Sequence, residues 1–375
     1  MNWLIFIPIL LVLVIIHELG HFIAAKLFGI KVEEFGFGFP PKLFGIKHGE
    51  TEYTINALPI GGFVKLYGED DAGAGRIQLK SKTHKTKDLN RAFFARPVWQ
   101  RILVVVAGVI MNAILGIAIV SFLYTQGAPV HLGYVKISAV EKGSPAQIAG
   151  IISGDRIESI NGTKVTAIKQ AQSLIYPHIN EPVNITVVRK NTPRNFSITT
   201  KECPPKDCGK KVGIIGVILA DTEIKKFPWY LAPIIGTQQT LIDSFTAIKT
   251  LPTLVGTAVS NMVAGQAPKG LGGPVAIARA TGEVANYGVI PVLALAASIS
   301  ISLAIFNILP IPALDGGRLF FMVIELLTGR KVNPKIEGYI HTVGMLILLG
   351  FMAWITYYDV LGALSHNNPF TNLLP

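Results

Sequence analysis

Two histidines and a glutamate near the N-terminus have the spacing of a zinc-hydrolase motif. The stretch LVLVIIHELGHFIAAKLF, residues 11–28, contains His17, Glu18 and His21. Residues four apart share one helix face, so the imidazoles of His17 and His21 can reach one Zn²⁺. Glu18 lies beside them and could take a proton from an attacking water. The alternative is a chance match, but ionisable side chains inside an apolar helix are costly and usually functional.

A catalytic zinc usually has three protein ligands, so a third residue is expected at the same depth. The candidates near the apolar stretches are Asp315, Glu325, Asp359 and His341. Asp315 lies in NILPIPALDGGRLFF, where two prolines interrupt a helix and two glycines follow. Irregular backbone at membrane depth is tolerated where it lines a cavity. We therefore predict Asp315 as the third ligand; the alternative is an aspartate that only caps the next helix.

Four stretches are apolar and long enough to cross a membrane. Half of the 375 residues are hydrophobic and only 15% are charged, below the quarter typical of soluble proteins. A helix needs roughly 20 apolar residues to cross the hydrocarbon core. The stretches that qualify are residues 3–28, 102–124, part of 284–314, and 339–358. The first lacks a basic region and a cleavage site, so we expect a span and not a removable signal peptide.

The positions of Lys and Arg predict how these spans are oriented. Eight basic residues occur from Arg76 to Arg101 inclusive, against one acid, and four more occur from Arg318 to Lys335 inclusive. We therefore expect residues 31–97 and 313–338 inside the cell, with both termini and residues 127–286 outside. His17 then lies roughly 20 Å along its helix, near the cytoplasmic side. On this reading the net charge of +11 sets orientation and contacts anionic lipid, and nucleic acid is not an expected partner.

Two motifs together resemble those of the site-2 proteases. The motif HELGH in the first span is joined to Asn-x-x-Pro-x-Pro-x-Leu-Asp-Gly-Gly, from Asn307 to Gly317. The closest likeness is to the bacterial regulator-of-sigma-E protease group. The segments VEEFGFGFPPKLFG, TEYTINALPIGGFVKLYGE, AGVIMN and GGPVAIA resemble segments of that group in the same order. This chain departs from the group in having one external module, a valine at 109, and the pair Cys203 and Cys208.

The resemblance implies a polytopic α-helical membrane protein with about four transmembrane helices, a membrane-associated β-hairpin and an inserted external PDZ-like α+β domain. It also implies a zinc-dependent intramembrane endopeptidase of the bacterial plasma (inner) membrane. Such enzymes cut transmembrane segments of single-pass proteins, for example anti-sigma factors or remnant signal peptides, often after another protease has shortened them. The expected cofactor is Zn²⁺, and the expected partners are transmembrane substrates and lipid. The alternative from another class is a non-catalytic membrane scaffold that presents a PDZ module.

Several residues are candidates for holding an unwound substrate. Residues 52–57 and 63–66 alternate like strands around Gly61 and Gly62, which predicts a hairpin whose edge could pair with an extended peptide. This assignment includes Phe63 and Val64. A cytosolic hairpin without a substrate role is the alternative. Asn307 and Asn112 could bind the substrate backbone or the oxyanion, or could make a helix–helix hydrogen bond, which we favour for Asn112.

The chain between the second and third spans reads as a separate module. KGSPAQIAGIISGDRIESINGTKV has the turns and short strands of a PDZ domain, and further alternating segments follow. HLGYV resembles the loop that binds a terminal carboxylate, which assigns the groove to Leu132, Gly133 and Tyr134. Residues 229–263 are expected to form a helix that lies on the membrane surface or packs against protein. A disulfide between Cys203 and Cys208 and two separate thiols remain alternatives.

These assignments divide the chain into four parts. Residues 1–126 form the N-terminal half of the membrane core, and residues 284–375 form its C-terminal half. Residues 127–220 form the external PDZ-like domain, and residues 221–283 form an external amphipathic linker.

Overall fold

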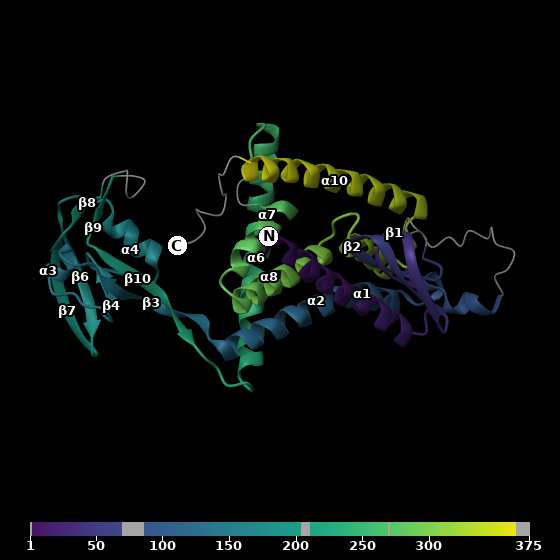
Figure 1. Cartoon of the computed structure of the whole chain (residues 1–375), viewed down its shortest axis with the longest axis horizontal. Helices are drawn as coiled ribbons and strands as arrows, with labels where there is room; N and C mark the ends of the chain where they lie inside the picture. Colours follow the sequence, from purple (N-terminus) through teal and green to yellow (C-terminus); the bar gives the residue numbers. More distant parts are fainter. Residues whose placement is uncertain (1, 70–85, 204–210, 269–270, 365–375) are drawn as a thin grey trace. The chain divides into compact units, whose positions relative to one another are not determined.

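The chain folds into two compact units (Figure 1). The computed structural model describes residues 2–69, 86–203, 211–268 and 271–364. Unit 1 combines Met1–Leu123 with Trp229–Pro375, and unit 2 is Tyr124–Pro228. Unit 2 is therefore an insertion in the chain of unit 1, joined to it by two connections.

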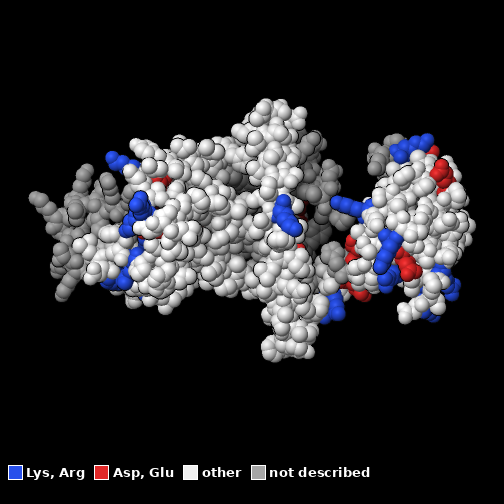
Figure 2. All heavy atoms as spheres, turned by 180° about the vertical axis from the view of Figure 1, so that it is seen from behind, with Lys and Arg blue, Asp and Glu red and all other residues white. Residues whose placement is uncertain are grey.

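The described residues of unit 1 include four helices that are long and apolar enough to cross a membrane, as predicted. They are α1 (Phe6–Leu27, preceded by the 3₁₀ helix η1, Asn2–Ile5), α2 (Val98–Gln126), α8 (Val289–Ile308) and α10 (Pro334–Leu364). On the face that Figure 2 shows, Lys and Arg residues gather at one end of unit 1, and α6 runs across this unit further along. The surface between these two places carries almost no charged residues. An uncharged belt of this kind is what a lipid bilayer requires.

Three more α-helices belong to the described part of unit 1. They are α6 (Ala232–Val263), α7 (Pro274–Ala285) and α9 (Asp315–Thr328). Helix α6 runs across the direction of α1 and α2 (Figure 1), and many of its apolar side chains are exposed, including Leu241 and Phe245. This arrangement suits a helix on a membrane surface, which stays a prediction.

The helices α1 and α2 approach closely at a glycine. A Cβ placed on Gly20 would lie 2.4 Å from the carbonyl oxygen of Ala107, so only glycine lets the backbones meet here. At the ends of these helices that adjoin the β1–β2 sheet, Ala25, Ile30, Val104 and Met322 belong to one buried cluster. Close packing of this kind fixes how far α1 is shifted along its axis relative to α2.

The strands β1 (Val32–His48) and β2 (Thr51–Leu66) form one sheet whose pairing differs from the predicted hairpin. Residues 34–37 pair with 52–55 on one side and with 62–65 on the other, and residues 42–48 pair with 51–56. Each long strand thus folds back on itself. The predicted pairing of 52–57 with 63–66 is wrong, because residues 34–37 lie between them. Among the described residues, 62–66 form one edge of this sheet, and we call them the edge segment.

The loop between β1 and β2 is tied to the rest of unit 1 by charge. Glu50 lies 2.7 Å from Arg91 and 2.7 Å from Lys26. The Arg91 hydrogen bonds, followed by the contact with Lys26, lower the pKa of Glu50 to about 2. Arg91 ends the 3₁₀ helix η2 (Thr86–Arg91), and η3 (Phe93–Ala95) leads on towards α2. These ion pairs hold the sheet against the end of α1.

Unit 2 is built on an antiparallel sheet with the strand order β10–β3–β4–β6–β7. The strands are β3 (Ala128–Val140), β4 (Arg156–Ile160), β6 (Pro182–Arg189), β7 (Thr192–Thr199) and β10 (Val217–Lys225), with the short β5 (Thr163–Lys164) beside β4. The remaining elements are α3 (Pro145–Ile148), α4 (Ile168–Ile175), and the strand pair β8 (Lys201–Cys203) and β9 (Val212–Ile214). Helix α4 packs Ala171 and Ile175 into the same core as the sheet. Of the two alternatives for the cysteines, the structure has Cys203 disulfide-bonded; Cys208, the other cysteine of the sequence, lies outside the described residues.

A buried ion pair stabilises unit 2. Arg189 donates two hydrogen bonds of 2.7 Å to the carboxylate of Asp155, whose side chain is fully buried. Burial opposes ionisation of Asp155, but the Arg189 hydrogen bonds outweigh it and hold the pKa below its usual range. This pair ties the turn before β4 to the end of β6.

Candidate metal centre

The two histidines of the candidate site lie one helical turn apart on α1, facing α2. His17 and His21 are both largely buried, with 11% and 13% of their side chains exposed. Opposite them on α2 is Gly108, where a Cβ would lie 2.4 Å from Nε2 of His21 and 2.8 Å from Cε1 of His17. The two imidazoles therefore occupy the space that any other residue at 108 would fill.

Asp315 reaches the site because the helical path breaks just before it. Helix α8 ends at Ile308, and Pro310 and Pro312 prevent its continuation. Ala313 has a left-handed backbone with φ of 77°, and α9 then begins at Asp315. A Cβ on Gly316 would lie 1.9 Å from the carbonyl oxygen of Leu309, so the returning chain packs directly on the end of α8. The predicted interruption of the helix is confirmed.

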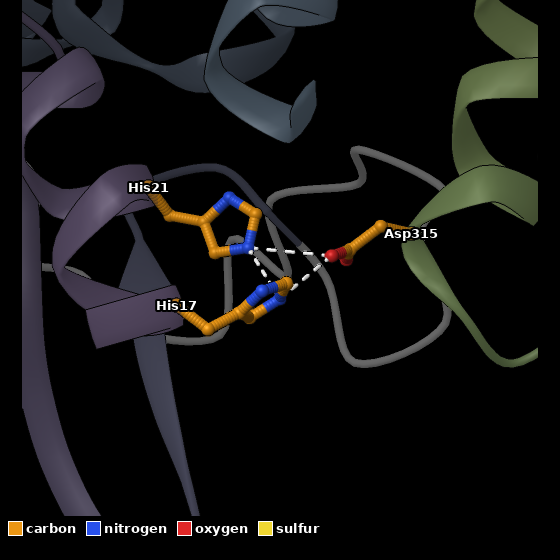
Figure 3. Close-up of side chains that lie close together, drawn as sticks. All are labelled: His17, His21 and Asp315. Atoms are coloured by element: carbon orange, nitrogen blue, oxygen red, sulfur yellow. Dashed lines mark hydrogen bonds and ion pairs between the residues drawn. The ribbon is translucent and has the colours of Figure 1, made fainter. Parts of the chain in front are cut away.

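Three side chains meet at one point (Figure 3). Nε2 of His17 lies 2.9 Å from Oδ2 of Asp315, and Nε2 of His21 lies 3.4 Å from the same oxygen. The ligand atoms of all three residues lie within 4.8 Å of one another. The structure also argues against a pure capping role for Asp315. The N-cap position of α9 belongs to Leu314, and the Asp315 carboxylate points at the histidines.

The hydrogen bonds of His21 show that this point suits a cation. Nδ1 of His21 lies 2.9 Å from the carbonyl oxygen of Val104, which can only accept, so Nδ1 carries a proton. In the neutral ring, Nε2 then bears a lone pair. That lone pair faces Nε2 of His17 at 3.2 Å and the Asp315 carboxylate. Two imidazoles and a carboxylate that converge in this way could hold a metal ion, and this set of ligand types is one that catalytic zinc sites use.

Asn112 provides the outer partner of His17. Its side-chain amide lies 3.3 Å from Nδ1 of His17, and the residue is completely buried. As oriented, the amide nitrogen faces Nδ1, while Oδ1 has no hydrogen-bond partner among the described residues. A half-turn of the amide lets Oδ1 accept a hydrogen bond from the N–H at Nδ1, which leaves the lone pair on Nε2 of His17 free to bind a metal. Asn112 is therefore not exposed to a substrate, and its assignment as a substrate-binding residue is not supported.

Glu18 lies next to the ligands and under the edge segment. A Cβ on Gly62 would lie 3.1 Å from Cγ of Glu18 and 3.3 Å from a methyl carbon of Val14. The edge segment thus passes directly over the helix turn that carries Glu18. Gly61, with φ of 89°, precedes this contact, and the ring of Phe63 covers Gly36. Val64 packs against the buried cluster below.

The other candidate ligands lie elsewhere and have other partners. Glu325 accepts a hydrogen bond of 2.6 Å from Arg101, and Asp359 accepts one of 3.0 Å from the backbone N–H of Ala276 at the start of α7. His341 accepts a hydrogen bond from the N–H of Ala313 at 3.0 Å, which holds the chain before Asp315. Asn307 is half-buried in the last turn of α8. Its role stays a prediction.

Sequence reasoning missed the support given by Gly108 and Asn112. The only local signal is that the two residues are four apart on α2 and so share a face. Which face of α2 contacts His17 depends on how α1 and α2 pack, and the sequence of neither helix alone predicts that packing.

The structure places the predicted groove residues of unit 2 inside a strand. Leu132, Gly133 and Tyr134 belong to β3, which lies between β10 and β4 in the sheet. The Tyr134 ring lies under the Arg156 guanidinium, 4.4 Å from its centroid. A carboxylate-binding loop needs free backbone N–H groups at the end of a groove. In β3, residues 128–131 and 136–140 pair with β10 and residues 135–136 pair with β4, whereas Leu132, Gly133 and Tyr134 pair with neither strand in the described sheet. The groove assignment therefore stays a prediction.

The sequence matches peptidase family M50 over residues 5–351. A protein of Clostridium perfringens named as a zinc metalloprotease is 35% identical over 353 residues, which cover 93% of this chain and 95% of that protein. The regulator of sigma-W protease RasP of Bacillus subtilis is 31% identical over 427 residues, covering 95% of this chain and 97% of RasP. The zinc metalloprotease RasP of Bacillus licheniformis is also 31% identical, with the same coverage.

Proposed function

This chain belongs to peptidase family M50, the site-2 proteases, and from that premise we propose that it cuts transmembrane segments of single-pass membrane proteins. It is a zinc metalloendopeptidase and a membrane protein of bacterial type. The observation that carries the proposal is the meeting of His17, His21 and Asp315 inside a bundle of apolar helices. A protease centre at that position suits a substrate that is itself in the bilayer.

The roles of the residues follow from their positions. His17, His21 and Asp315 would hold the zinc, and Asn112 would orient the ring of His17. When bound, zinc supplies Lewis-acid activation of water and of the scissile carbonyl. Glu18 takes the proton of the attacking water and passes it to the leaving amine. Asn307 remains a candidate for contact with the substrate backbone.

The edge segment would present the substrate to this centre. A peptide bond in a helix is shielded by its own hydrogen bonds and must be unwound before attack. Residues 62–66 pair with 32–37 on one side, and their other side has no partner strand among the described residues. An unwound substrate can add there as a further strand, which brings it over Glu18 next to Gly62. Gly61, Gly62, Phe63 and Val64 keep the substrate-binding role in this proposal.

The proposed orientation has both termini outside and the metal centre towards the cytoplasmic side. The basic residues of the β1–β2 sheet and its neighbours support it, since they gather at one end of the uncharged belt (Figure 2). The external PDZ-like domain, predicted as residues 127–220, would then extend to the end of unit 2 at Pro228, because β10 pairs with β3 as far as Lys225. The linker predicted as residues 221–283 would begin after that point. The antiparallel sheet of unit 2, with α4 packed on it, suits that assignment.

Unit 2 would limit which substrates reach the centre. It is a folded unit joined to the membrane core at both ends. We propose that it excludes proteins with bulky external parts, so that a prior cut by another protease is needed. RasP of Bacillus subtilis is named as a regulator of sigma-W protease. Anti-sigma factors and remnant signal peptides are therefore the substrate classes that we propose for this chain.

A metal assay combined with a cleavage assay tests the proposal. The purified protein should bind one zinc per chain and cut members of a panel of remnant signal peptides and shortened single-pass segments in liposomes. Glu18→Gln should keep zinc, because the three ligands remain, and lose cleavage. His21→Ala and Asp315→Ala should lose both zinc and cleavage.

A zinc-loaded wild-type protein that cuts none of the panel would contradict the proposed substrate class. Cleavage by Glu18→Gln at the wild-type rate would remove Glu18 as the base. The alternative, a membrane scaffold without catalysis, predicts no difference between the wild type and Glu18→Gln in any assay.

A further inference from the structure

The carboxylate of Glu69 links the edge segment to the helix that carries Asp315. Glu69 follows the end of β2 by three residues. Its Oε1 accepts a hydrogen bond from Nη1 of Arg318, and its Oε2 lies 3.4 Å from the N–H of Leu66, the last residue of the edge segment. Arg318 lies three residues after Asp315, on the same face of α9. One side chain thus contacts both the strand and the ligand helix.

The edge segment is held at its two ends by the two helices that supply the metal ligands. At one end Gly62 rests on Glu18 of α1, next to His17. At the other end the Glu69 carboxylate fixes Leu66 relative to α9. The intervening Gly68 has φ of 76° and packs closely against Ala92 and Phe94, so the turn between Leu66 and Glu69 has little room to move.

Both charged groups are largely shielded from solvent. The Glu69 side chain is 15% exposed and the Arg318 side chain 30% exposed. Ion pairs in such surroundings are screened little by salt, and loss of one partner leaves an uncompensated charge. The contact is therefore rigid enough to define a position, which a solvent-exposed pair would not be.

We propose that the Glu69–Arg318 ion pair is a positioning device that sets which substrate bond lies over the metal centre. This inference rests on strand addition to the edge segment, as proposed above. A strand advances roughly 3.3 Å per residue, and a slip of one residue turns every side chain to the other face. A displacement of about 1 Å can lower the rate roughly a hundredfold. Loosening Leu66 relative to α9 would therefore change both the rate and the bond that is cut.

The first test is Glu69→Gln, with a panel segment that the wild type cuts at one bond. The variant should keep one zinc per chain, lose about tenfold or more in kcat, and give products from two or more neighbouring bonds, seen as additional masses in the mass spectrum. KM should change much less than kcat, since the strand edge itself remains.

A second variant separates positioning from stability. In Glu69→Met with Arg318→Met, no buried charge is left unpaired, so the fold should be about as stable as the wild type. The spread of cleavage sites should nevertheless persist. The matched control is Arg101→Met with Glu325→Met, which removes a buried ion pair of 2.6 Å between α2 and α9 that does not touch the edge segment. The control should cut at the single wild-type bond.

Three results would overturn the inference while leaving the protease function intact. They are a single unchanged cleavage site with unchanged kcat in both Glu69 variants, loss of zinc from Glu69→Gln, and an equal spread of sites in the control pair. A wild-type protein that binds zinc but cuts no segment would instead refute the proposed function.

Discussion

Replacing Asn112 should weaken zinc binding although Asn112 does not touch the metal. Its amide lies 3.3 Å from Nδ1 of His17, the ring nitrogen that faces away from Asp315. Asn112→Leu keeps the volume and the burial but removes the hydrogen bond. A hydrogen bond to a group that carries charge contributes about 1.5–3 kcal/mol. Each 1.4 kcal/mol is a factor of ten, so zinc affinity should fall by about 10- to 150-fold.

Asn112→Asp distinguishes the two orientations of the amide. A carboxylate can only accept, so it can replace Oδ1 as the partner of a protonated Nδ1 of His17. We expect Asn112→Asp to keep zinc affinity within about tenfold of the wild type, whereas Asn112→Leu does not. The measurement is a competition titration of the purified protein with a chromogenic chelator.

Ser300→Ala is the control for helix packing. Ser300 is fully buried and donates a hydrogen bond of 2.8 Å to the backbone carbonyl of Asn112, so its loss disturbs the α2–α8 contact without changing His17. Zinc affinity should stay near the wild-type value. If Asn112→Asp lost as much affinity as Asn112→Leu, the amide nitrogen would be the group that faces His17, and the orienting role argued here would be wrong.

Three further predictions concern pH, orientation and access. Isolated unit 2, residues 124–228, should lose stability as pH falls below about 4. The pKa of Asp155 is lower in the folded state than in the unfolded chain, where it is about 3.9. The stabilisation from the Asp155–Arg189 pair is therefore complete above the unfolded pKa and is lost as pH falls through the folded pKa. Thermal unfolding followed by circular dichroism should show this loss in the wild type and much less in Asp155→Asn with Arg189→Met. In a protein whose native cysteines are replaced, Lys331→Cys should react with an impermeant thiol reagent only after the cells are permeabilised. Lys164→Cys should react with it in intact cells. The reverse pattern would show that the proposed orientation is wrong. Replacing residues 128–225 by a flexible linker should let the enzyme cut a long, unshortened substrate while it cuts the short form at a similar rate, and continued refusal of the long form would exclude a size filter.

The sequence predicts the helical parts of this fold well and the sheet poorly. Each span is an apolar stretch whose length alone indicates a membrane helix, and the break before Asp315 follows from Pro310 and Pro312. Strand pairing in β1 and β2 depends on contacts far apart in the chain. Residues 52–57 and 63–66 alternate as strands should, but nothing local shows that residues 34–37 lie between them.

The candidate site shows the same division. The spacing of His17 and His21 and the proline-glycine context of Asp315 select the three residues that the structure brings together. The neighbours that orient them come from packing. The sequence leaves open whether Asn112 makes a helix contact or binds the substrate, because its proximity to His17 depends on the α1–α2 interface that Gly20 permits.

Gly108 affects how one decides from sequence whether a related protein can bind its metal. A methyl group at this position would occupy the space of the two imidazoles, 2.4 Å from Nε2 of His21, without changing any zinc ligand or the glutamate. A relative could therefore keep both motifs intact and still be unable to hold its metal. Surveys that sort active proteases from inactive relatives by the ligand motifs alone would misclassify such a protein. The residue that aligns with Gly108 provides the missing criterion, and it lies in a different span from either motif.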